Sequence, residues 1–305
     1  MINSPSVLWK LRAAMRRPGK LKENFLGTLR SSLMWDSLYR SLPEPKISGE
    51  VPVGDPQMHI VVKDQLIKAG IVVKDLRIDM RNYKSFLLRA AYNKYPYYYN
   101  GGKENQIHEK SLEHFVAAEL LDLNDKDVYI DIANGDSPSP DIYNRIFGCR
   151  TYAQDMYFKE AREGVIPGNA CSMPVADGFA SKMALHNSFE HFEDNDDVCF
   201  MQEANRVLQP GGRLCIIPLF LYTAFANQTD PSVVRDYSIF DSGATIFATR
   251  GWLNRFGRHY DVSHFIARIM KARRDFDLTV YYMLNEKEVD SSCYAKFVAL
   301  FERTT

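Results

Sequence analysis

The sequence predicts an α/β fold built on an open, mostly parallel sheet with helices on both faces. The apolar run Val128–Ile130 is typical of a strand buried in such a sheet, and a turn of small residues and a helix over Ser139–Phe147 follow it. A second short strand, Arg150–Ala153, comes next. This order presents backbone N–H groups and a helix N-terminus to a ligand. The 305 residues, 46% hydrophobic and 25% charged, are enough to bury a large core.

The first forty residues differ from the rest in charge. They hold eight lysines and arginines against two acids, an excess that the remainder of the neutral chain balances. Apolar residues recur at helical spacing, as at Leu21, Phe25, Leu29 and Leu33. Residues 1–45 are therefore predicted to form a basic amphipathic helical arm. Such an arm can lie on an anionic membrane surface, pack on the main domain or contact a second subunit.

Residues 46–102 are predicted to be a linker or small subdomain that ends in a tyrosine-rich lid. Their proline-rich start indicates a linker, and two short apolar runs, His59–Val62 and Ile71–Val73, are expected to be strands. Tyr98 and Tyr99 close a run of five tyrosines in eight positions before a glycine pair. They are expected to cover the acceptor, with the glycines Gly101–Gly102 as hinge. A surface loop of packed rings is the alternative.

Further motifs follow the first strand and turn in a fixed order. Asp155 comes about twenty residues after Asp131, the spacing at which a carboxylate after a second strand accepts hydrogen bonds from ribose hydroxyls. A Gly-Asn-Ala turn ends at Ala170, and a predicted strand over Ser181–Leu185 ends before His186. A stretch reading EANRVLQPGGRL then ends a predicted helix and begins another strand.

This order of motifs resembles the class I S-adenosylmethionine-dependent methyltransferases. The resemblance is strongest over residues 108–221. It implies a Rossmann-like sheet of seven strands within residues 103–305 and S-adenosyl-L-methionine as the cofactor. It also implies the residues that contact this cofactor: Asp131, Ala133, Asn134, Gly135, Asp155, Met156, Asn169, Ala170, His186 and Asn187.

The chain departs from the family pattern in two places. Ala133, Gly135 and Ser137 stand where the family usually has three glycines. All three are small enough for close backbone approach, but alanine and serine are expected to lose access to positive φ. Asn169 replaces the usual aspartate of the adenine turn, and its carbonyl can still accept from an adenine amino group.

The segment after the predicted strand Ser181–Leu185 is the best place for chemistry. A histidine with a pKa near neutral can take a proton from an acceptor oxygen or nitrogen, so His186 and His191 are candidate general bases. Lining the cofactor pocket and a hydrogen bond at a helix start are the respective alternatives. No metal site is expected at the acidic run Glu193–Asp197, because no suitably spaced histidine or further acid accompanies it.

Residues 222–258 are predicted to be an insertion that builds the substrate pocket, as long connections at the carboxyl edge of a sheet usually do. Its end gathers residue types that stack on sugars or bases, or that pair with carboxylate or phosphate. The predicted substrate-binding residues there are Arg250, Trp252, Arg258 and Tyr260. A surface turn is the alternative. A helix over Asp261–Arg274 and a closing hairpin of Leu278–Leu284 with Tyr294–Phe301 should follow.

The first hypothesis for function is S-adenosylmethionine-dependent O- or N-methylation of a small-molecule or glycan acceptor. The second is a methyltransferase fold that has lost catalysis and serves as a binding or scaffold protein. The presence of only one of the family's three loop glycines favours it. A nucleic-acid methyltransferase is a third, opposed by the balanced overall charge. Five cysteines without CxxC spacing predict a cytoplasmic protein. The basic arm leaves peripheral membrane contact open, and a homo-oligomer is also compatible with the sequence.

Overall fold

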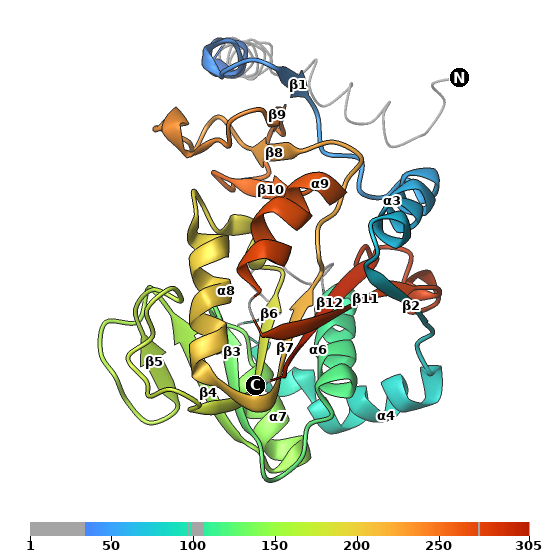
Figure 1. Cartoon of the computed structure of the whole chain (residues 1–305), viewed down its shortest axis with the longest axis vertical. Helices are drawn as coiled ribbons and strands as arrows, with labels where there is room; N and C mark the ends of the chain where they lie inside the picture. The colour runs from blue at the N-terminus through green and yellow to red at the C-terminus, as the bar shows by residue number, and fades with distance from the viewer. Residues whose placement is uncertain (1–33, 97, 99–106, 274, 305) are drawn as a thin grey trace, which may run out of the picture.

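Two sheets of different size organise the chain in the computed structural model, which describes residues 34–96, 98, 107–273 and 275–304. The larger sheet has eight strands and the smaller has four. The smaller sheet lies beyond one edge of the larger, at the top of Figure 1. Most of the predicted basic arm, residues 1–45, lies outside the described residues, and so do Tyr99 and the glycine pair of the predicted lid.

The larger sheet confirms the predicted Rossmann-like arrangement. Its strands, in spatial order, are β2 (Val72–Leu76), β11 (Phe276–Met283), β12 (Phe297–Arg303), β7 (Leu208–Ile217), β6 (Ala180–His186), β3 (Val128–Ile132), β4 (Arg150–Asp155) and β5 (Val165–Pro167). Strand β12 is antiparallel to both neighbours, and the other neighbouring pairs are parallel. The predicted closing hairpin is β11 with β12. The sheet differs from the prediction by an eighth strand, β2, which extends it beyond β11.

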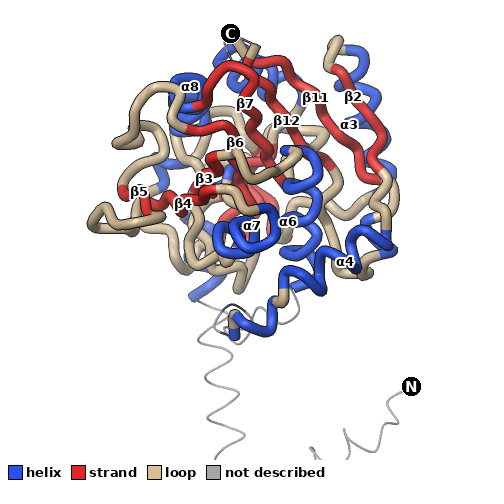
Figure 2. Tube along the Cα trace, turned by 90° about the horizontal axis from the view of Figure 1, so that it is seen from below, coloured by secondary structure: helices blue, strands red, loops and turns tan. Residues whose placement is uncertain are grey.

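Helices cover both faces of this sheet. Helices α3 (Pro56–Lys68), α8 (Asp196–Val207) and α9 (Val262–Phe265) contribute to the core on one face, and α4 (Met80–Ala90), α6 (Ile107–Leu121) and α7 (Ser139–Phe147) to the core on the other. Figure 2 shows the second group together on one side of the strands. Along β3, Ile130 and Ile132 join the first core and Tyr129 the second, as the alternation of a strand requires.

One local prediction is wrong. His59–Val62 lies inside α3 rather than in a strand, because Asp55 caps the helix and Pro56 occupies its first position. The predicted helix over Asp261–Arg274 is confirmed over residues 262–272, where a π-helical turn, Ile266–Met270, follows α9.

The smaller sheet contains the predicted insertion together with a strand from far upstream. Its order is β1 (Lys46–Ser48), β9 (Thr245–Ala248), β8 (Ala226–Thr229) and β10 (Gly257–His259). After β1, the chain crosses this sheet as a strap over residues 49–53: Gly49 N donates to Ala248 O at 2.9 Å, and Val51 N donates to Gln228 Oε1 at 3.0 Å. The strap thus ties the segment before residue 54 to the insertion.

Among the helices that the structure describes, none has the length and apolar character needed to span a membrane.

Candidate functional site

A cavity of about 790 Å³ lies between the carboxyl ends of β3 and β6 and the smaller sheet. We call it the edge cavity. Its floor contains the turn after β3 and the segment after β6, and its roof contains the strap and the residues around β10. The lining residues that matter below are Tyr98, Lys110, Asp131, Ala133, Asn134, Gly135, His186, Asn187, Glu190, His191, Trp252 and Tyr294. In open α/β sheets, ligands bind where the strands end, so this is the candidate site.

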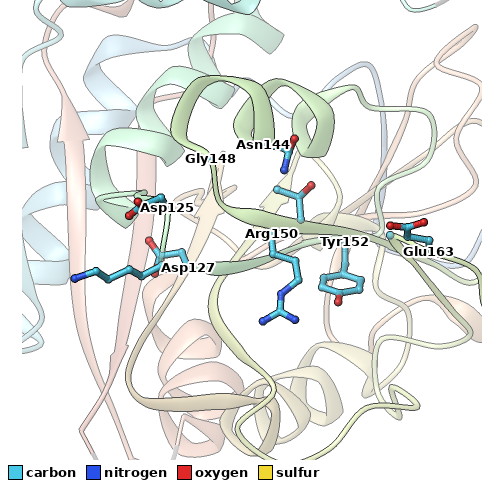
Figure 3. A pocket seen from close by; sticks show the side chains of 10 residues that line it. Asp125, Asp127, Asn144, Gly148, Arg150, Tyr152 and Glu163 are labelled. Atoms are coloured by element: carbon cyan, nitrogen blue, oxygen red, sulfur yellow. The ribbon is translucent and has the colours of Figure 1, made fainter.

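A second cavity, of about 380 Å³, lies at the opposite edge of the sheet (Figure 3). Asp127 and Arg150, at the start of β3 and β4, line it together with Glu163. Because it lies at the amino ends of the parallel strands, it is not where this fold binds its ligands.

Asp131, at the end of β3, holds the following turn in place. Its carboxylate accepts hydrogen bonds from Asn134 Nδ2 at 2.6 Å, from Ser139 Oγ at 2.7 Å and from Tyr129 OH at 3.2 Å. Burial raises the pKa of Asp131 to about 6. The carboxylate therefore fixes the loop through its internal bonds while it lines the edge cavity.

The turn adopts the backbone that the glycine-rich pattern would favour, despite its substitutions. Ala133 has a φ of 50° and Gly135 a φ of 60°. The expectation that an alanine at 133 loses access to positive φ is wrong, because Gln154 fixes this backbone. Ala133 N donates to Gln154 Oε1 at 3.2 Å and Asn134 N donates to Gln154 O at 2.9 Å. A left-handed alanine costs about 1 kcal/mol, so the turn is held against local strain.

Asp155, predicted to bind ribose, also bonds to the turn. Its Oδ2 accepts from Gly135 N at 2.7 Å and its Oδ1 accepts from Tyr157 N at 2.9 Å. Its side chain is buried and is not part of the lining of the edge cavity. Each carboxylate oxygen has a second lone pair, so these two bonds leave acceptor capacity for a hydroxyl.

The remaining predicted adenosine contacts also lie outside the edge cavity. Met156 is 68% exposed at the end of β4. Asn169 uses its Oδ1 to accept from Cys171 N at 2.8 Å, and Ala170 is buried. The edge cavity thus brings together the predicted contacts on β3, its turn and the end of β6, but not those on β4 and the adenine turn.

His186 is buried in the floor and is poorly suited to act as a general base. Its Nε2 lies 3.3 Å from Tyr129 OH and 3.7 Å from Asp131 Oδ1. Burial, helped by His114, lowers its pKa well below the ordinary value. A histidine with so low a pKa is a weak base, which argues against the predicted catalytic role. Its neighbour Asn187 accepts from Tyr294 OH at 3.1 Å.

His191 is the predicted base that remains accessible. Its Nδ1 lies 2.6 Å from Phe256 O, and its Nε2 lies 3.6 Å from Glu190 Oε1. About a third of the side chain is exposed. Glu190 and His191 both line the edge cavity, and both lie on a short 3₁₀ turn after β6.

The predicted substrate residues divide into two groups. Tyr98 and Trp252 line the edge cavity, and burial raises the pKa of Tyr98. Arg250 does not line that cavity and lies 5.8 Å from the centre of the Trp35 ring. The predictions for Arg258 and Tyr260 are contradicted, because both side chains are fully buried.

Arg258 and Tyr260 instead hold the smaller sheet against α8. The Arg258 guanidinium donates to both oxygens of Asp241 at 2.7 and 2.8 Å and lies 3.2 Å from Asp197. Tyr260 OH donates to Asp197 Oδ2 at 2.6 Å. The acidic run that begins helix α8 therefore receives structural partners from the far end of the insertion.

The sequence analysis missed a buried charged group on α6. Glu109 and Lys110 are both buried. Glu109 accepts from the backbone N–H groups of Tyr294 and Ala295 at 2.7 and 2.9 Å. Lys110 lines the edge cavity and donates to both oxygens of Glu113 at 3.0 and 2.9 Å. Burial raises the pKa of Glu109 to about 7 and that of Glu113 to about 8.

Comparison with known proteins adds a match to one family model. Residues 143–216 match the family model described as a methyltransferase domain. The resemblance to the class I methyltransferases is confirmed. The matched stretch of this methyltransferase-type core runs from within α7 to β7 and so includes the end of β6 and its histidines. No curated protein matches the chain.

Solved structures resemble the chain only distantly. One is the Burkholderia thailandensis 1,6-didemethyltoxoflavin-N1-methyltransferase, at 12% identity, with a TM-score of 0.46 over 76% of this chain and 94% of that one. Another is the Streptomyces coelicolor A3(2) geranyl diphosphate C-methyltransferase, at 15% identity, with a TM-score of 0.39 over 64% and 76%.

Proposed function

We propose that this chain transfers a methyl group from S-adenosyl-L-methionine to a small-molecule or glycan acceptor. The observation that supports this most is the placement of the edge cavity. One side is the turn after β3 and the end of β6, where a cofactor's amino-acid end would lie. The other side is the smaller sheet, which belongs to no cofactor motif. The volume of the edge cavity, about 790 Å³, falls within the range of small-molecule sites.

The fit of the cofactor to this chain is good at one end. Residues 133–137 line the cavity and would let a ligand come close to their backbone, and Asn187 and Lys110 contribute polar groups to the same lining. When bound, the cofactor supplies an activated methyl group on a sulfonium. The residues of the chain would hold that group in line with the acceptor and exclude water, which is most of what such a transfer needs.

At the other end of the cofactor, Asp155 would have two roles. It holds the turn through Gly135 N, and its remaining lone pairs would accept the ribose hydroxyls. The exposed Met156 beside it would cover the adenine. We keep 222–258 as the acceptor-binding insertion, because β8, β10 and Trp252 belong to the roof of the cavity or adjoin it.

The experiment is calorimetric titration of the protein with S-adenosylmethionine and S-adenosylhomocysteine. We expect micromolar binding to the wild type, weakened strongly in Asp155→Ala. Asp277→Ala, an exposed carboxylate on β11, is the matched control and should bind as the wild type does. Because Asp155→Ala also removes a bond to the turn, its thermal unfolding is measured alongside.

A binding protein without catalysis is the second candidate. The bonds of Asp131 and Asp155 to their own turn favour it, because both carboxylates already serve the loop. A folded wild type that binds neither compound at millimolar concentration would contradict the proposed methyl transfer and favour this alternative. A strong salt dependence of RNA binding would instead favour a nucleic-acid methyltransferase.

A cytoplasmic location, a homo-oligomer and contact of the basic arm with a membrane surface stay predictions. The five cysteines are all unpaired, which supports a reducing compartment.

A further inference from the structure

The segment after β6, in the floor of the edge cavity, holds a buried carboxylate oxygen that has no hydrogen-bond partner among the described residues. Glu190 is 5% exposed and lines the cavity. Among the residues that the structure describes, its Oε2 has no hydrogen-bond partner. Leaving such an oxygen unpaired is costly, whereas a ligand that brings a donor would satisfy it.

His191 presents a second acceptor to the same space. Its Nδ1 lies 2.6 Å from Phe256 O, and because a carbonyl can only accept, Nδ1 carries the proton. In the neutral ring, Nε2 is then an acceptor, and it lies 3.6 Å from Glu190 Oε1. With a neutral ring, two acceptors therefore lie 3.6 Å apart. A group with several N–H bonds and a positive charge would serve both.

The cationic side chains around this place are already paired. Lys110 donates to Glu113, Arg255 to Glu193, and Arg258 to Asp241. In the described part of the chain, Lys110 is the only lysine or arginine that lines the edge cavity, and Glu113 already accepts hydrogen bonds from it. This removes the support that the arginines of the insertion gave to an anionic acceptor.

An aromatic ring completes the site. The Trp252 ring lies 5.8 Å from that of His191, and both line the cavity. It is seated against Gly257, where a Cβ would come within 2.7 Å of the indole. A ring in this position attracts a cation across its face.

We propose that the acceptor is a basic amine, held by Glu190 and His191 beside the Trp252 ring. This inference rests on the proposed methyl transfer and names its substrate class. In the reaction, the ammonium gives one proton to His191 Nε2, which is exposed enough to pass it to solvent. The freed nitrogen lone pair then forms the bond to the methyl carbon. The bond from that carbon to sulfur breaks, and its electron pair stays on the sulfur.

The test measures binding without turnover. The protein is first saturated with S-adenosylhomocysteine and then titrated calorimetrically with two matched pairs of probes. These are 2-phenylethylamine against 3-phenylpropanoate, and tryptamine against indole-3-propionate. We expect at least one amine to bind at least tenfold more tightly than its carboxylate partner, since a charge-assisted hydrogen bond is worth that much.

The variants are Glu190→Gln and Glu193→Gln. Glutamine has the same shape as glutamate, and the Glu190 carboxylate donates no hydrogen bond that the substitution could remove. Glu190→Gln should therefore fold, and thermal unfolding checks this. Amine affinity should fall about tenfold or more in Glu190→Gln and stay unchanged in Glu193→Gln, whose carboxylate pairs with Arg255.

The outcomes separate the two proposals. Loss of S-adenosylhomocysteine binding in the wild type would overturn the proposed function itself. If the protein still binds S-adenosylhomocysteine, any of three results would overturn the amine inference alone. The carboxylates could bind more tightly than the amines, no amine could bind at millimolar concentration, or Glu190→Gln could bind the amines as the wild type does.

Discussion

Replacing Arg258 by methionine tests whether this residue is structural. The guanidinium is fully buried, donates to both oxygens of Asp241 and also donates to Phe192 O at 2.7 Å and Asp194 O at 2.9 Å. Removing one partner of a buried ion pair costs about 3–5 kcal/mol, because the other charge is left uncompensated. Asp197 retains Arg268 at 2.7 Å, so the loss concerns Asp241 and we expect a value near the lower end.

Urea unfolding measures this change against a matched control. Arg255→Met removes an arginine that is 57% exposed and pairs with Glu193, so it should cost only about 0–1 kcal/mol. Adding Asp241→Asn to Arg258→Met should restore part of the stability, since no unpaired charge then remains. If Arg258→Met and Arg255→Met lost the same small amount, the structural role given to Arg258 would be refuted and a ligand-binding role would return.

Two further predictions concern the turn after β3 and a buried acid on α6. Ala133→Gly should raise the free energy of unfolding by about 0.5–1 kcal/mol, because glycine accepts the φ of 50° without strain; a loss of stability in urea unfolding would contradict the strained turn. Glu113 has a folded-state pKa of about 8 against an ordinary 4.5, so the folded state binds more protons between these values and stability should fall as pH rises through this range. In unfolding measurements over this pH range, Glu113→Gln should lose less stability than the wild type, whereas Glu163→Gln, at an exposed position, should behave as the wild type does. Parallel stability curves for the wild type and both variants would contradict the raised pKa of Glu113.

The parts of the fold that the sequence predicts are those set by local signals. The unit from Val128 to Phe147 was predicted because a buried strand, a turn of small residues and a helix follow one another without interruption. The closing hairpin of β11 and β12 was predicted from two adjacent strand patterns. Both depend on neighbours in sequence, so composition and periodicity are sufficient to find them.

The parts that were missed depend on distant partners. Strand β1 pairs with β9, about 200 residues away, and no local pattern indicates such a pairing. Arg258 resembles a ligand-binding arginine until Asp241 and Asp197 are seen beside it. Glu190 lay between predicted residues, and its acidic side chain next to His191 was a signal that could have been used. Buried charges on α6 broke the rule that charged residues are solvated.

The strap has a consequence for how the chain reaches its final form during synthesis. Strand β1 emerges from the ribosome early, yet its only partner strand in the described structure, β9, begins at Thr245. The roof of the edge cavity therefore assembles only after most of the protein has been made. Until then, the segment around Lys46–Ser48 has no partner strand, and exposed unpaired strands are prone to mispairing and aggregation. A nascent chain released before residue 245 would have the ligand-facing turn of β3 but no enclosure above it.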